Sequence, residues 1–150
     1  MPNTINQSFF FSHQPEVVWE YLTTAELLAQ WLMPNDFQPV LGHEFRFTIK
    51  PLPIFDFDGI FYCKVLELIP LKKLSYSWKG GPGNGKISLD TIVEWTLVEK
   101  DNGTELNLKH SGFDETENFN IYSGMIQGWQ ENLQKMSQKI NLAKNGPANT

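Results

Sequence analysis

The sequence predicts an α+β protein in which an antiparallel sheet curves around one long C-terminal helix. Two observations carry this prediction. From residue 118 to 144, apolar residues recur at alternating spacings of four and three and would form one stripe on a helix: Tyr122, Ile126, Trp129, Leu133, Met136 and Ile140. Ahead of this segment, several short runs alternate apolar and polar residues with a period of two, which is typical of strands. The helix needs a partner for its stripe, and a curved sheet is the natural one.

The first part of the chain predicts a strand followed by two short helices. Residues 5–11 form a short apolar run and predict the strand. Pro15 stands where a first helix can begin. Thr24 is suited to cap a second helix over residues 25–32, and Pro34 stops that helix.

A run of about five antiparallel strands is expected next. In the first of them, Phe45, Phe47 and Ile49 share the apolar face. Two more strands are predicted over residues 56–68 and 89–98, with a third between them that turns Leu74, Tyr76 and Trp78 to one side. The glycine-rich residues 80–86 predict a mobile turn before the strand at 89–98. Asp101-Asn102-Gly103 predicts a tight hairpin, because Asn-Gly supplies the positive φ values that such a turn needs; its returning strand turns Leu106, Leu108 and His110 inward and ends at Ser111-Gly112.

Length and composition favour one soluble domain over residues 1–144, with a short disordered tail over residues 145–150. Cys63 is the single cysteine among 150 residues, so no internal disulfide is expected and the cytoplasm is the expected location. The sequence predicts neither a secretory leader nor a membrane span. The net charge is −5 and the basic residues are scattered, which argues against a nucleic-acid partner.

Several short motifs occur along the chain in a characteristic order and spacing. They are Pro15-Glu16-Val17-Val18-Trp19, then Leu28, Trp31 and Pro34, then Val65 to Pro70 with Leu74 to Trp78, then Gly103 to Leu106 with His110 to Phe113, and finally Gly128-Trp129 with Leu133. From Ile5 to about Ile140 the chain thereby resembles the AHSA1-like family (activator of Hsp90 ATPase homologue 1-like) of the START/Bet v 1-like (SRPBCC) superfamily. It departs from the family at Cys63, where a small glycine is common, and at the aromatic residues 54–57.

The resemblance implies a helix-grip fold with a hydrophobic cavity between the sheet and the C-terminal helix. Members of this family are described as binders of lipids, polyketides or other apolar compounds, as Hsp90 co-chaperone domains, and occasionally as enzymes. By position, the residues expected to line the cavity and bind a ligand are Trp31, Met33, Phe47, Phe61, Trp78, Trp95, His110, Met125 and Trp129. Plain core packing explains each of them at least as well.

Three functions follow from this resemblance, in order of preference. The first is non-catalytic binding of a small hydrophobic ligand, which would be lipid-like or polyketide-like. A role in the stress response is one physiological context for this function. The second is a protein-interaction module or co-chaperone acting on an Hsp90-type chaperone. The third is a cyclase-type or hydrolase-type enzyme that uses His110.

His110 is the polar residue of greatest interest on the inward face. A neutral imidazole among aromatic residues is able to bind a ligand or act as a base, but it more often bonds a neighbouring group. Glu94 and Glu105 alternate onto the outer face, so no carboxylate is aligned with His110 and no catalytic residue is predicted.

No metal or cofactor is predicted either, because the three histidines lack metal-ligand spacing and Cys63 reads as a buried small hydrophobe. Gly124 and Gly128 fall on the side of the predicted helix away from the apolar stripe. Close approach by another segment, or local bending, are the two explanations that the sequence offers for them.

Overall fold

The elements of the computed structural model follow the predicted order of one strand, two short helices, five strands and a long helix. The structure describes residues 3–52, 54, 57–113 and 119–145. The elements are β1 (Asn3–Phe11), α1 (Pro15–Thr23), α2 (Ala25–Trp31), β2 (Glu44–Thr48), β3 (Ile60–Ile69), β4 (Lys73–Gly80), β5 (Leu89–Lys100), β6 (Gly103–Phe113) and α3 (Phe119–Asn145). The predicted tail over 145–150 lies outside the described residues except for Asn145, which ends α3.

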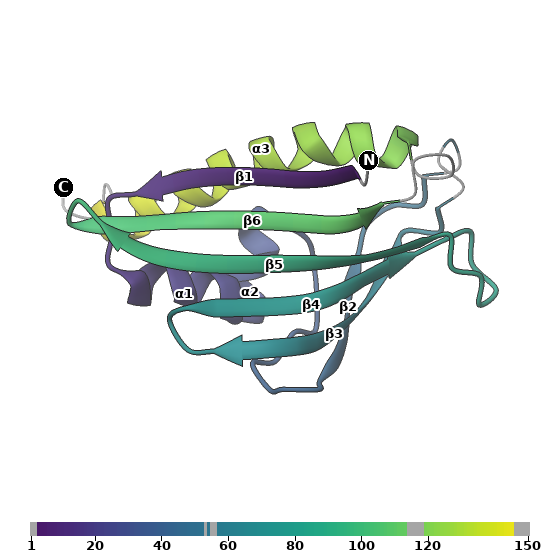
Figure 1. The fold of residues 1–150 in the computed structure, drawn as a ribbon, viewed down its shortest axis with the longest axis horizontal. Coiled ribbons are helices and arrows are strands. Elements are labelled where there is room, and N and C mark those ends of the chain that lie inside the picture. Colours follow the sequence, from purple (N-terminus) through teal and green to yellow (C-terminus); the bar gives the residue numbers. More distant parts are fainter. Residues whose placement is uncertain (1–2, 53, 55–56, 114–118, 146–150) are drawn as a thin grey trace.

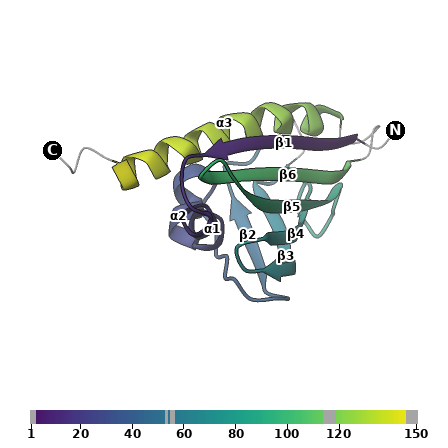
Figure 2. The ribbon, with the colours of Figure 1, turned by 60° about the vertical axis from the view of Figure 1, so that its left-hand side comes forward.

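The six strands form one antiparallel sheet in the order β1-β6-β5-β4-β3-β2, so the first strand of the chain pairs with the last (Figure 1). In both ribbon views α3 runs alongside β1, and α1 and α2 lie near the C-terminal half of α3 (Figure 2). Trp31 of α2 and Trp129 of α3 both pack against Trp95 of β5, which places these helices on the same face of the sheet. The predicted helix-grip fold is confirmed. No helix in the described part of the chain is long and apolar enough to cross a membrane.

Alternation along the strands decides which side chains meet the helices. Val93, Trp95 and Leu97 of β5 are buried, and so are Leu106, Leu108 and His110 of β6, which were predicted to face inward. On α3 the predicted stripe supplies the buried residues Trp129, Leu133, Met136 and Ile140. The stripe and the alternating strands therefore form one apolar core.

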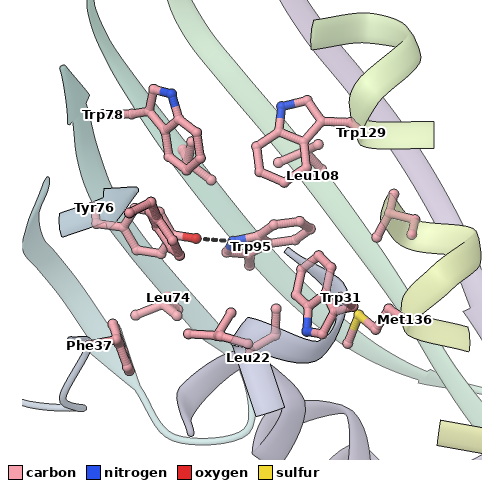
Figure 3. Close-up of a cluster of buried hydrophobic side chains, with 14 of the residues drawn as sticks. Leu22, Trp31, Phe37, Leu74, Tyr76, Trp78, Trp95, Leu108, Trp129 and Met136 are labelled. Carbon is pink, nitrogen blue, oxygen red and sulfur yellow. Dashed lines mark hydrogen bonds between the residues drawn. The ribbon is translucent and has the colours of Figure 1, made fainter. Parts of the chain in front are cut away.

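Large aromatic side chains fill the centre of this core (Figure 3). The Trp95 indole N–H donates to the Tyr76 hydroxyl over 2.9 Å, and the Trp31 indole N–H donates to the Tyr21 carbonyl over 3.0 Å. The Trp31 and Trp95 rings meet edge to face at 6.0 Å. An indole N–H that is buried without an acceptor costs free energy, and these two indoles avoid that cost because each has an acceptor.

The boundaries of β2 and β3 differ from the prediction. β2 ends at Thr48, and Ile49 is 38% exposed instead of sharing the apolar face of Phe45 and Phe47. β3 begins at Ile60, later than the predicted residue 56, because Gly59 has a φ of +93° and breaks the extended backbone. The Asp58 carboxylate then accepts the N–H of Ile60 over 3.0 Å and starts the strand.

The β5–β6 hairpin forms at the predicted place with a different assignment of its turn residues. Lys100 pairs with Gly103, so Asp101 and Asn102 are the two central residues, with φ of +50° and +62°. The prediction that Asn102-Gly103 supplies both positive φ values is wrong. Gly103 is needed for another reason, because a Cβ there would collide with the Phe11 carbonyl of the neighbouring strand.

Two further predictions of element ends need correction. β6 does not end at Ser111-Gly112 but continues to Phe113, with Gly112 at a φ of +100° inside it. Thr24 does stand at the N-cap of α2, but its side chain makes no capping hydrogen bond. The glycine-rich segment between β4 and β5 is held by a backbone bond from the Lys86 N–H to the Gly83 carbonyl, 3.1 Å long.

Truncating the stripe of α3 is expected to destabilise the whole domain. Met136 is fully buried, and Met136→Ala removes its contacts and leaves a cavity, which costs about 2 to 5 kcal/mol of unfolding free energy. Chemical denaturation measures this loss. The matched control is Lys135→Ala, one residue away and exposed, which should change the free energy by no more than about 0.5 kcal/mol. Equal effects of the two substitutions would contradict the packing of α3 described above.

Candidate ligand cavity

A cavity of about 340 Å³ lies between the first half of α3 and the ends of β3, β4 and β5 that carry Phe61, Trp78 and Leu89. Its walls also include the segment after α2 and the loop between β2 and β3. The lining is almost wholly apolar and consists of Leu32, Met33, Ile49, Leu52, Phe57, Phe61, Trp78, Gly80, Gly81, Ser88, Leu89, Gly124, Met125, Gly128, Trp129 and Asn132. Such a volume and lining are typical of a site for a small apolar molecule.

The structure divides the nine predicted ligand-binding residues into two groups. Those that line the cavity are Met33, Phe61, Trp78, Met125 and Trp129. Those that lie in the packed core outside its lining are Trp31, Phe47, Trp95 and His110. Contact between any of them and a ligand stays a prediction.

Several lining residues escaped the sequence analysis because they lie outside the regular strands. Leu52 and Phe57 belong to the loop between β2 and β3, and a backbone bridge pairs them across it. The Phe57 ring stacks on Phe61 at 4.6 Å and continues the aromatic wall. The unusual aromatic content of residues 54–57 was the signal that pointed to this wall.

The two glycines of α3 have a simpler role than the sequence suggested. A Cβ built on Gly124 or Gly128 meets nothing within 4 Å, so no other segment approaches these positions closely. Both glycines line the cavity, and Gly124 is exposed at its rim. Each costs the helix roughly 1 kcal/mol relative to alanine, and what they provide in return is open space.

His110 lies behind the cavity wall and is fully buried. The Trp129 indole N–H donates to its Nδ1 over 3.0 Å, so Nδ1 is unprotonated and the proton sits on Nε2. The Nε2–H then donates to the Thr91 hydroxyl over 2.8 Å, and that hydroxyl donates to the Trp78 carbonyl over 2.7 Å. The expectation that His110 bonds neighbouring groups is confirmed, and both ring nitrogens are engaged.

Burial also fixes the protonation state of His110. The loss of solvation lowers its pKa from 6.5 to about 3, because a charged imidazolium is costly among aromatic rings. The ring is therefore neutral near pH 7 and matches the hydrogen-bond pattern around it. Burial likewise raises the pKa of the Cys63 thiol well above its ordinary value, with a smaller contribution from Asp36. Cys63 is thus a protonated, buried thiol.

The cavity carries no charge of its own among the residues that the structure describes. Its lining includes no Asp, Glu, Lys, Arg or His, and its polar side chains are Ser88 and Asn132 besides the indole of Trp78. Within the described ranges, no group of three His, Cys, Asp or Glu is arranged to hold a metal ion. This arrangement is able to hold an apolar molecule against its walls.

The curved antiparallel sheet, the long C-terminal helix and the apolar cavity between them define a helix-grip domain of the START/Bet v 1-like type. A model of the family described as activator of Hsp90 ATPase homolog 1-like protein matches residues 12–141, and the chain belongs to this family.

Solved structures of bacterial proteins share the fold over nearly their whole length. Protein MLL2253 from Mesorhizobium loti is 33% identical, with a TM-score of 0.78, and the match covers 90% of this chain and 94% of that one. Protein BH1534 from Bacillus halodurans is 28% identical, with a TM-score of 0.72 and coverage of 91% and 96%. The Aha1 dimer from Colwellia psychrerythraea is 24% identical, with a TM-score of 0.74 and coverage of 94% and 98%. Among proteins of curated function, none matches this chain.

The buried neutral histidine should make the protein less stable in acid. The unfolded chain binds a proton at His110 near pH 6.5, whereas the folded chain does so only near pH 3, so stability is lost as pH falls between these values. From pH 7 to pH 4.5 the contribution of His110 to this loss is roughly 2 to 3 kcal/mol.

Urea denaturation at both pH values, compared with His110→Gln, measures this contribution. Glutamine offers an acceptor to Trp129 and a donor to Thr91 but does not titrate, so the variant should lose less stability between pH 7 and pH 4.5 than the wild type does. The same loss in both proteins would show that His110 is not the titrating group.

Proposed function

We propose that this protein binds a small hydrophobic ligand in the cavity between its sheet and α3. The observation that carries the proposal is the cavity itself, which has a volume of about 340 Å³ and almost wholly apolar walls beside a packed core. Apolar surface that is left without a partner favours an apolar occupant, because covering it removes it from water.

The glycines of α3 support this proposal independently. Larger residues at Gly124 and Gly128 would give a more stable helix and would meet no steric obstacle at Cβ, yet both positions leave the cavity open. Membership of a family whose fold encloses such a cavity agrees with this reading. We place the function in the cytoplasm, where the buried Cys63 thiol stays reduced.

A second candidate function rests on the description of the family. Its model is named for an activator of an Hsp90 ATPase, and a solved structure with the same fold is that of an Aha1 dimer. An interaction module of this kind would use the outer surface of the domain and would not depend on the interior.

Catalysis by His110, the third possibility, has the least support. The ring lies outside the cavity lining, is fully buried and uses both nitrogens for structural hydrogen bonds. A general base needs to reach the proton that it removes, and His110 has no such access in this arrangement.

Filling the cavity from α3 should weaken ligand binding without harming the fold. Gly128→Leu places an isobutyl group in the open space beside Gly128, and the change from glycine also favours the helix by roughly 1 kcal/mol. Titration with the neutral fluorescent probe N-phenyl-1-naphthylamine should give a Kd at least about tenfold higher for the variant, because overpacking a filled site costs roughly 1 to 3 kcal/mol.

The matched control is Gln127→Leu, which adds the same side chain at the neighbouring, exposed position of α3. It should bind the probe as the wild type does, and both variants should remain folded by circular dichroism. Unchanged binding by Gly128→Leu, or no binding by the wild type, would contradict the proposed function.

The same variant separates the two candidate functions. A module that acts through its outer surface should stimulate the ATPase of an Hsp90-type chaperone equally well as wild type and as Gly128→Leu, since this substitution changes the interior. Stimulation by both proteins would favour the co-chaperone function. Its absence from both, together with probe binding by the wild type alone, would leave ligand binding as the function.

A further inference from the structure

One buried indole differs from the others in its hydrogen bonding. Four tryptophans of the described chain are almost fully buried, and three of them donate their N–H: Trp31 to a carbonyl, Trp95 to a hydroxyl and Trp129 to His110. Trp78, which is also fully buried, has no acceptor for its Nε1–H among the described residues. Leaving such a donor unpaired is unfavourable, and native structures rarely do so without a reason.

The ring that carries this unpaired donor forms part of the cavity wall, where the nitrogen itself has almost no accessible surface. Trp78 lines the cavity together with Gly80, which follows two residues later on β4. Figure 3 shows the indole nitrogen on the edge of the ring that faces away from Tyr76, which is the direction in which β4 continues toward Gly80. The ring is held by Phe61 at 4.5 Å and Trp129 at 5.5 Å, so its edge has a fixed direction.

The rest of the lining restricts which kind of ligand group is able to accept a hydrogen bond from the Trp78 N–H. No side chain of the described lining is ionisable, so a charged ligand group would find no opposite charge there. Burying an unpaired carboxylate or ammonium in such surroundings is very costly. A carbonyl oxygen, by contrast, is uncharged and accepts one N–H bond without needing a counter-ion.

We propose that the cavity selects an uncharged, mainly apolar ligand that carries a carbonyl oxygen, and that this oxygen accepts a hydrogen bond from Trp78 Nε1–H. The proposal rests on the proposed binding function and adds the chemical class of the ligand to it. Trp78 then plays two roles: its ring forms the wall and its N–H fixes the orientation of the ligand.

Benzophenone and diphenylmethane are suitable probes, because they have the same two rings and differ only in a carbonyl in place of a methylene. Their Kd values are measured by calorimetry for the wild type and for Trp78→Phe, which keeps an aromatic ring and removes the N–H. Trp78→Phe should reduce the preference for benzophenone over diphenylmethane about tenfold, as expected for the loss of one hydrogen bond. The different hydration of the two probes cancels in this comparison.

A second measurement on the wild type does not depend on the folding of the variant. In a ¹H–¹⁵N spectrum, the indole N–H signal of Trp78 should lie further downfield with benzophenone than with diphenylmethane, because the two probes have the same rings and only benzophenone offers an acceptor. The bonded N–H signals of Trp31 and Trp95 serve as internal references, because their acceptors belong to the protein.

The outcomes distinguish this inference from the proposed function. Binding of both probes with an unchanged preference and with the Trp78 signal at the same position in both complexes would overturn the carbonyl inference while leaving a hydrophobic binding site. Failure of both probes to bind the wild type would overturn the inference and the proposed function together.

Discussion

The architecture depends on a chain of hydrogen bonds that crosses the core from α3 to β4. It begins at the Trp129 indole, passes through the His110 ring and the Thr91 hydroxyl, and ends at the Trp78 carbonyl. Each group has the donors and acceptors that its neighbour requires. All of these hydrogen bonds form together only when His110 is neutral and its proton is on Nε2. Because α3, β6, β5 and β4 each contribute one residue, this series of hydrogen bonds fixes α3 against the sheet where the packed core meets the cavity.

The side chains on the core side of this series of hydrogen bonds are much larger than those on its cavity side. On one side, Trp31 and Trp95 fill the space beneath α3 and satisfy their own indole donors. On the other, Gly124 and Gly128 of α3 line the cavity and contribute no side chain, and a Cβ at either position would meet nothing within 4 Å. The cavity thus lies where α3 carries small residues, beside tryptophans that pack between the helix and the sheet. Among the described residues, packing is dense around these tryptophans and looser at the cavity.

The sequence predicted the parts of this molecule that periodic patterns encode. The stripe from Trp129 to Ile140 and the alternation of β5 identified the buried faces correctly, because burial follows the periods of 3.6 and 2 directly. The cavity was harder to predict. Trp78 and Trp95 have the same residue type on adjacent strands and face the same way, yet only Trp78 lines the cavity. What separates them is their position along the strands relative to the glycines of α3, and that depends on tertiary register. Turn details such as the positive φ at Asp101 also lay beyond local pattern.

The pairing of the first strand with the last has a consequence for how the domain folds. Phe11 of β1 lies opposite Thr104 of β6, whereas the strands from β2 to β6 each pair with the next along the chain. During synthesis, β1 therefore emerges long before its partner and has to remain unpaired until β6 is complete. Closing so long a loop carries an entropic cost before any contact offsets it, so the rate of folding should be governed by this one late strand pairing.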